Sequence, residues 1–442
     1  MLRNLGIVLG CGLAAVVPVL TGAPALGRAA AAADHALTEK VSYQGKSYTL
    51  ELDKVSVRAP GYAVYVQQAD GSLQAVAVPA PRTYAGGVAG LTNAQASGVI
   101  DPQGRFDGQL VFDRGETWFI RDGAVVEDRT ATPTYHWPSA SNAALNVTVG
   151  AGQAGRTTYR WDIGYDLAYA WWSDPATVNK SLAEAVSLVD ETTVDLLLDY
   201  ESNAMLRPAV RRVIIRAAAA QDPYPSASSQ LDTVRTQWQD QLNNDVVDDA
   251  AVLTGTDGGS GVAYVGTAGS GWGAARSGGT GTTNIVLRHE LGHTWNANDN
   301  HTNGPEGPTI NSGNAFARWD GTELSAFFRY RDSNLKRFTA TPTFGIALPP
   351  YAALDLVDGT RAGVAVTFRP LANDFDANGD ALTLQGIGPR SKLGGTITHR
   401  GSVVTYRPPA VTSADTFDYV SYVVRDATGR TARGVCMFRV SP

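Results

Sequence analysis

Residues 289–301, HELGHTWNANDNH, constrain the fold of this chain more than any other stretch. His289 and His293 are four residues apart, so on a helix they project from one face, one turn above the other. Two imidazoles placed in this way can bind one zinc ion, and Glu290 beside the first can reach a water on that ion. Residues 283–287 give the helix an apolar side to bury. The stretch therefore predicts a helix that carries a zinc site.

Such a site indicates metal-assisted hydrolysis. Zinc acidifies and orients a water, and Glu290 then takes its proton as general base and passes it to a leaving amine. A chance match to the motif is rare in a chain with only 6 histidines. This rarity disfavours the alternative of an exposed helix with two ordinary histidines. The motif says much less about the substrate.

The class of protein is limited by the length of the chain, its net charge and its N-terminal residues. A chain of 442 residues is too long for one core and predicts about two or three domains. The net charge of −6 and the lack of a basic stretch argue against a nucleic-acid partner. Arg3, an apolar run over residues 5–20 and the small residues that follow predict a secretory signal peptide over residues 1–33, and hence an extracellular or periplasmic protein. No later apolar run approaches the roughly 20 residues of a membrane span.

The pattern along the chain divides it into three folded parts. Residues 34–138 show short strands and turns, which predicts an all-β unit. Residues 139–158 are rich in small and polar residues, as expected of a linker that proteases cut. Residues 159–345 alternate strands and helices, which predicts a mixed α/β (α+β) unit with the metal helix in its second half. Residues 350–442 return to strands with frequent turns, which is typical of an antiparallel β-sandwich.

With these features in view, residues 155–340 resemble the metzincin zinc proteases, closest to their adamalysin or reprolysin branch. The matching runs are VLTG at 252–255, GVAYVG at 261–266 and residues 284–293. The N-terminal unit looks like the prosegment of such enzymes. The final domain resembles the Ig- or cadherin-like modules of bacterial surface proteins, through residues 371–383 and the strand at 419–426.

The chain departs from the family pattern HExxHxxGxxH at two positions of the zinc motif. Asn296 takes the glycine position, and asparagine is among the few residues that tolerate a left-handed backbone. Asp299 takes the position of the third histidine and can bind zinc through oxygen. His301 is the competing third ligand, and register favours Asp299.

A further departure concerns the methionine turn of the family. The methionines are Met1, Met205 and Met437, so Asn311 stands where the resemblance places that methionine. A polar residue beneath the histidines needs hydrogen-bond partners. This puts metal affinity in doubt more than the fold.

The resemblance also implies where a substrate binds. An extended peptide is expected to pair by main-chain hydrogen bonds with an edge strand formed by Gly261, Val262, Ala263 and Tyr264. Position after the active-site loop further suggests that residues 316–319 line a specificity pocket.

Latency by a cysteine switch is excluded, because no cysteine lies between Cys11 and Cys436. We instead expect the N-terminal unit to block the cleft sterically or through a carboxylate such as Asp107 or Asp113. Cutting the 139–158 linker would then release activity. Cys436 lies in a strand-like run and is expected to be a buried apolar residue rather than a nucleophile.

The C-terminal domain holds a second acidic pattern. Asp374, Asp376, Asn378, Gly379 and Asp380 alternate like the first half of a calcium loop. The twelfth position is Gln385 rather than glutamate, which disfavours an EF-hand. A polar turn is the favoured interpretation, and Ca²⁺ binding is the alternative.

Taken together, the sequence predicts a secreted zinc endopeptidase that acts on protein or peptide substrates and is made as a precursor. Two alternatives stay open. One is a binding or adhesion protein with a degenerate protease domain, favoured by the Ig-like tail, which would contact a surface or polymer, and by the lost methionine. The other is a zinc hydrolase of cell-wall material.

Overall fold

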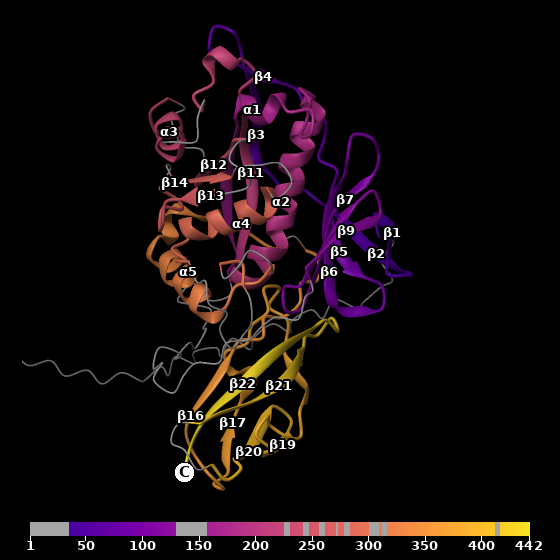
Figure 1. The fold of residues 1–442 in the computed structure, drawn as a ribbon, viewed down its shortest axis with the longest axis vertical. Coiled ribbons are helices and arrows are strands. Elements are labelled where there is room, and N and C mark those ends of the chain that lie inside the picture. Colours follow the sequence, from indigo (N-terminus) through magenta and orange to yellow (C-terminus); the bar gives the residue numbers. More distant parts are fainter. Residues whose placement is uncertain are drawn as a thin grey trace, which may run out of the picture. The chain divides into compact units, whose positions relative to one another are not determined.

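The computed structural model describes residues 35–129, 157–224, 230–241, 247–255, 261–270, 273–277, 283–299, 309–311, 316–343, 345–411 and 416–442. Seven strands of the N-terminal part close into a barrel (Figure 1). Leu50, Leu110 and Trp118 lie in its core. The barrel strands are β1 (Leu37–Tyr43), β2 (Lys46–Val55), β5 (Thr83–Val88), β6 (Leu91–Ile100), β7 (Phe106–Phe112), β8 (Thr117–Arg121) and β9 (Ala124–Arg129).

A second, larger sheet forms the middle of the chain. Its order is β13-β14-β12-β10-β11-β3-β4, with β15 paired to β10. The strands β10, β11, β12, β14 and β3 run parallel, and β13 is antiparallel at one edge. The bounds are β3 (Arg58–Gln67), β4 (Leu73–Val76), β10 (Tyr159–Leu167), β11 (Leu206–Ile215), β12 (Asp249–Leu253), β13 (Gly261–Ala263), β14 (Gly273–Ser277) and β15 (Thr339–Ala340).

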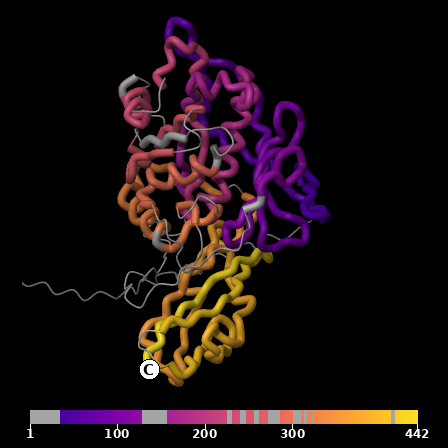
Figure 2. Tube along the Cα trace, in the orientation of Figure 1, coloured from indigo at the N-terminus to yellow at the C-terminus, as the bar shows by residue number. Residues whose placement is uncertain are grey.

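The structure divides the strands of residues 34–138 between these two sheets, whereas the sequence pattern predicts one all-β unit. Strand β3 pairs in parallel with β11, and β4 pairs with β3, so both extend the α/β sheet (Figure 2). Val57 and Val64 accordingly lie in the main core rather than in the barrel core. Alternation identifies a strand but does not say which sheet it joins.

Helix α2 (Leu182–Ala204) connects the two sheets. It packs on β11 on one side and on β5, β6 and β7 on another (Figure 1). The helix begins at Ser181, whose hydroxyl accepts a hydrogen bond from the Glu184 amide, and ends at Met205 in a left-handed conformation. Because it is covered on several faces, it buries acidic residues as well as apolar ones. The remaining helices include α1 (Tyr169–Ser173), α3 (Gln230–Thr236), α4 (Thr283–Thr294) and α5 (Gly321–Ser333).

The C-terminal strands form a four-stranded sheet, β16-β22-β21-β18, and a three-stranded sheet, β17-β20-β19. Tyr406 stacks on Phe438 between them, and Cys436 is buried in the same core, as its apolar surroundings predict. The bounds are β16 (Asp355–Arg361), β17 (Val366–Phe368), β18 (Thr383–Ile387), β19 (Thr396–Arg400), β20 (Val403–Arg407), β21 (Thr416–Arg425) and β22 (Thr431–Ser441). The chain is therefore a multidomain, largely β protein that ends in a sandwich. Within the described residues, no helix is both long and apolar enough to cross a membrane.

Candidate metal centre

Helix α4 carries both motif histidines and ends one residue after the second. Asn296 has a φ of 72°, the left-handed conformation that asparagine tolerates. The amide of Asn296 donates to the carbonyl oxygen of His293 over 2.8 Å, and that of Ala297 donates to Gly292 over 3.2 Å. This tight turn reverses the chain and brings Asp299 back to the histidines.

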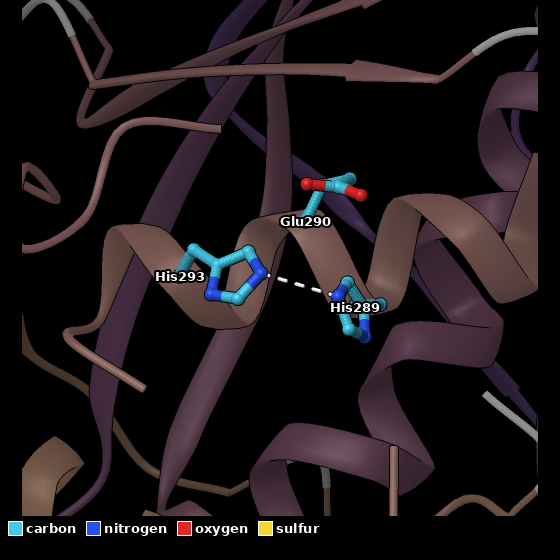
Figure 3. A group of neighbouring side chains, drawn as sticks. All are labelled: His289, Glu290 and His293. Atoms are coloured by element: carbon cyan, nitrogen blue, oxygen red, sulfur yellow. Dashed lines mark hydrogen bonds between the residues drawn. The ribbon is translucent and has the colours of Figure 1, made fainter. Parts of the chain in front are cut away.

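Three potential ligand atoms meet beside the helix. Nε2 of His289 lies 3.1 Å from Nε2 of His293 (Figure 3). The same nitrogen lies 3.1 Å from Oδ1 of Asp299. Nε2 of His293 lies 3.4 Å from the same carboxylate oxygen. Tetrahedral zinc with nitrogen and oxygen ligands separates them by about 3.3 Å, so this triangle has the size of one face of a zinc site. His301, the competing ligand, lies outside the described residues.

The outer nitrogens of both rings determine the chemistry of the inner ones. Nδ1 of His289 lies 3.2 Å from the carbonyl oxygen of Ile310, and Nδ1 of His293 lies 2.7 Å from that of Ala297. A carbonyl oxygen can only accept, so each Nδ1 carries the hydrogen, and a neutral ring then presents a lone pair at Nε2. Burial lowers the pKa of His289, and repulsion from His293 lowers it further, which favours the neutral ring. Three acceptors therefore face one another, and a cation between them fits this donor set.

Glu290 lies between α4 and the edge strand β13. Its side chain is 6% exposed, and one oxygen lies within 4.8 Å of ligand nitrogens of both histidines. Figure 3 shows its carboxylate on a different side of the helix from the two rings. A Cβ at Gly261 would overlap with this carboxylate, so only glycine lets β13 pass so close. A water can bridge the remaining distance from Glu290 to a shared ligand position.

The predicted substrate strand is at the edge of the large sheet. Gly261, Val262 and Ala263 form β13, whose other side pairs with no strand among the described residues. The Val262 side chain is 41% exposed. Tyr264 lies beyond the strand, and its hydroxyl donates to Asp232 of α3. The structure thus brings three of the four predicted residues to an edge beside Glu290, and directs the tyrosine elsewhere.

Several residues that hold α4 are not part of the motif. Arg288 forms a buried ion pair with Asp199 of α2 at 3.8 Å, and the Tyr200 hydroxyl donates to the carbonyl oxygen of Arg288 over 2.6 Å. At the other end, the Thr294 hydroxyl donates to Asp249 over 3.0 Å, and Trp161 Nε1 donates to the same oxygen over 2.7 Å. The sequence offers one signal for Asp199 and Tyr200 of α2: an acidic and an aromatic residue stand next to each other inside a largely apolar helix.

Residues 316–319, which are expected to line a specificity pocket, are all buried. Trp319 is fully buried and packs on Tyr200 and Phe327. It fills the space over Gly292, where a Cβ would overlap with the indole. Because the core is closely packed, the buried indole of Trp319 sets the distance at which helix α4 packs on the core.

Asn311 occupies the place that the resemblance gives to a methionine. It is 1% exposed, and its Nδ2 donates to the carbonyl oxygen of Asn298 over 3.2 Å. Its neighbour Ile310 supplies the carbonyl oxygen that faces His289. The amide nitrogen therefore has a partner on the loop that carries Asp299. Oδ1 of Asn311 is buried and has no hydrogen-bond donor among the described residues, so the polar side chain is only half satisfied.

The two carboxylates proposed as a latch take part in other contacts. Asp107 accepts a hydrogen bond from the amide of Asp122 over 3.0 Å. Asp113 pairs with Arg433 of β22, with an Nε–Oδ2 distance of 3.0 Å. The structure therefore does not support either residue as a ligand that silences the histidine pair.

Comparison with known proteins gives matches among solved structures only at low similarity. No curated protein matches the chain. Among solved structures, a chaperone–substrate complex is 14% identical, covers 59% of this chain and 39% of its own, and has a TM-score of 0.30. The chain thus spans about two fifths of that structure. Metalloproteinase-II from Bacteroides fragilis is 11% identical; the match covers 66% of this chain and 90% of the metalloproteinase, with a TM-score of 0.30. An endo-fucoidan hydrolase from glycoside hydrolase family 107 is 16% identical; the match covers 21% of this chain and 14% of the hydrolase, with a TM-score of 0.17.

The sequence of the C-terminal sandwich matches a family directly. Residues 348–438 match the bacterial Ig domain family. This agrees with the two sheets of that region and with the resemblance drawn from its strands. The sheets are not the wholly antiparallel ones that the strand pattern predicts, because β16 pairs in parallel with β22. The last part of the chain is a bacterial Ig domain.

Proposed function

We propose that this protein is a secreted zinc-dependent endopeptidase with a metzincin-like catalytic unit over residues 159–345. The observation that carries the proposal is the convergence of Nε2 of His289, Nε2 of His293 and Oδ1 of Asp299 within 3.4 Å. Each ring has its hydrogen turned outward to a carbonyl oxygen. Such a donor set suits zinc, and Glu290 stands beside it.

In the proposed mechanism, each part of the site has its own role in peptide hydrolysis. Zinc held there supplies Lewis acidity, which lowers the pKa of a water and polarises a carbonyl oxygen. Glu290 accepts the proton of the attacking water and delivers it to the leaving amine. The free edge of β13 binds the substrate main chain as an added strand, which orients the scissile bond over Glu290. Burial of Glu290 keeps bulk water from competing for that proton.

Exchange of the general base tests this mechanism. Glu290→Gln keeps the two imidazoles and Asp299, so the variant should retain one zinc per chain and lose at least about 100-fold in casein hydrolysis. Glu39→Gln on barrel strand β1 is the matched control and should behave as the parent. Casein cleavage by Glu290→Gln at the parent rate would show that the mechanism is wrong.

A binding or adhesion protein with an inactive protease-like unit is the second candidate. The bacterial Ig domain favours it, because such a module is compatible with surface or polymer contact. Zinc bound without cleavage of any member of a peptide library would favour this candidate. Activity confined to a cell-wall digest would instead favour a zinc hydrolase of non-peptide material.

A further inference from the structure

A second cluster of potential ligands lies in the Ig domain. Asp376 and Asp380 belong to the loop before β18, and Asp426 follows β21. One oxygen of each lies within 4.8 Å of the other two. The sequence pattern points to the first two residues, but only the fold brings Asp426 to them.

Each of the two buried carboxylates has one oxygen engaged in hydrogen bonds and one oxygen with no donor among the described residues. Oδ1 of Asp376 accepts from the amides of Asn378 and Asp380 over 2.8 and 3.1 Å. Oδ1 of Asp426 accepts from the Thr428 hydroxyl and the Arg430 amide, both over 2.9 Å. Oδ2 of Asp376 and Oδ2 of Asp426 are buried and accept no hydrogen bond from the residues that the structure describes. The residues are 0% and 4% exposed, so bulk solvent does not reach these oxygens.

No ion pair among the described residues balances the negative charge of the cluster, although Arg430 attracts Asp426 electrostatically from beyond ion-pair distance. Within the described part of the chain, no basic side chain lies within ion-pair distance of Asp376, Asp380 or Asp426. Burial raises the pKa of Asp376 to about 7, and the two neighbouring carboxylates contribute. Buried like charges of this kind are costly unless a cation joins them.

The cluster differs from the linear calcium loop that the sequence suggested. Asp374 uses Oδ1 to accept from the Ala353 amide and the Tyr422 hydroxyl, both over 2.8 Å. Asn378 uses its side-chain oxygen to accept from the Leu348 amide over 2.7 Å. These two residues hold the loop in place, while the oxygens that remain come from two separate loops.

We propose that Asp376, Asp380 and Asp426 bind one calcium ion. Three carboxylates and no nitrogen or sulfur ligand suit a hard cation. Ca²⁺ binds oxygen at about 2.3–2.6 Å, so oxygens up to roughly 5 Å apart can share one ion. The ion ties the loop before β18 to the turn between β21 and β22. Because Phe375 and Ala377 beside Asp376 lie in the main core, it also stiffens the attachment of that loop.

Calcium titration of the full chain tests the site. Glu290→Gln protein is used as parent, because this exchange avoids self-digestion if the peptidase proposal is right. Isothermal titration with CaCl₂ should show one ion per chain, and calcium should raise the melting temperature by several degrees. Asp380→Asn and Asp426→Asn should each lose both effects. Asp358→Asn, an exposed aspartate of the same domain, should keep them.

The sign of the stability change separates ligand loss from folding damage. Without calcium, either Asp→Asn variant removes a charge repulsion and should melt at or above the parent temperature. With calcium, the same variant should melt below the parent. No calcium uptake by the parent at millimolar concentration, or uptake that persists in both variants, would overturn the site. Calcium uptake in this experiment does not require zinc binding, so the calcium site and the proposed peptidase activity can fail separately.

Discussion

Arg58 and Asp190 form a bidentate ion pair between strand β3 and helix α2. Their Nη2–Oδ2 and Nε–Oδ1 distances are 2.6 and 3.1 Å, and the side chains are 10% and 4% exposed. The pair joins an N-terminal strand to the core of the middle domain. Together with the pairing of β3 to β11, it makes the N-terminal residues part of the sheet that supports the metal helix.

This arrangement changes what a cut in the linker should do. We expect protein nicked between residues 139 and 158 to keep its N-terminal piece, because removal would expose the edge of β11 and bury Asp190 without its partner. Gel filtration in native buffer should show both pieces in one peak, and they should separate only in denaturant. Separation in native buffer with a rise in activity would instead support a releasable prosegment.

The same ion pair makes a stability prediction. Arg58→Ala leaves a buried carboxylate unpaired and should lower the free energy of unfolding by about 3 kcal/mol. Arg105→Ala, which breaks the more exposed pair with Asp101, should lower the free energy of unfolding much less. Urea unfolding of the two variants measures the difference. Equal losses would mean that the Arg58 pair contributes no more than a surface contact.

The third zinc ligand can be identified by paired substitutions. Asp299→Ala removes an oxygen that lies 3.1 Å from His289 Nε2, so zinc affinity should fall by at least about 100-fold. His301→Ala should leave the affinity within a few fold of the parent. Competition with a chromophoric chelator measures both. The opposite pattern would assign the ligand to His301.

Local pattern predicts the parts of the site that one helix supplies. The spacing of His289 and His293 requires only helical geometry, and the left-handed turn at Asn296 follows from its side chain and position. The supporting contacts are long-range and leave no local signal. Asp199 reaches Arg288, Asp426 reaches Asp376, and β3 leaves its neighbours in sequence to join β11. Position in the sequence likewise predicts Trp319 at a pocket wall, whereas its long-range contacts bury it.

Asp199 is expected to position the metal helix rather than to take part in the reaction. Asp199→Asn removes the charge that holds Arg288 while keeping the side-chain shape, so the variant should bind zinc but lose about 10-fold in kcat with little change in KM. Asp358→Asn in the Ig domain is the control. A loss of zinc in parallel with activity would show that the residue acts through folding of the site instead.

Asp248 should make stability depend on pH. It accepts the amide of Asp162 over 2.7 Å, and burial raises its pKa to about 7 from 3.8. Because the folded chain holds this proton more tightly than the unfolded chain, the carboxyl destabilises the fold increasingly as pH rises from about 4 to about 7. Asp248→Asn keeps an acceptor for Asp162 and removes the charge. Its advantage in unfolding free energy over the parent should grow by about 2 kcal/mol between pH 5 and pH 8.

Metal-free protein gives the clearest measurement of this difference, because zinc binding itself varies with pH and would add a second pH-dependent contribution to stability. The exposed substitution Asp358→Asn should show no comparable growth over the same interval. If the advantage of Asp248→Asn shrinks as pH rises, Asp248 is stabilised as the anion, and the hydrogen bond from Asp162 outweighs the cost of its burial.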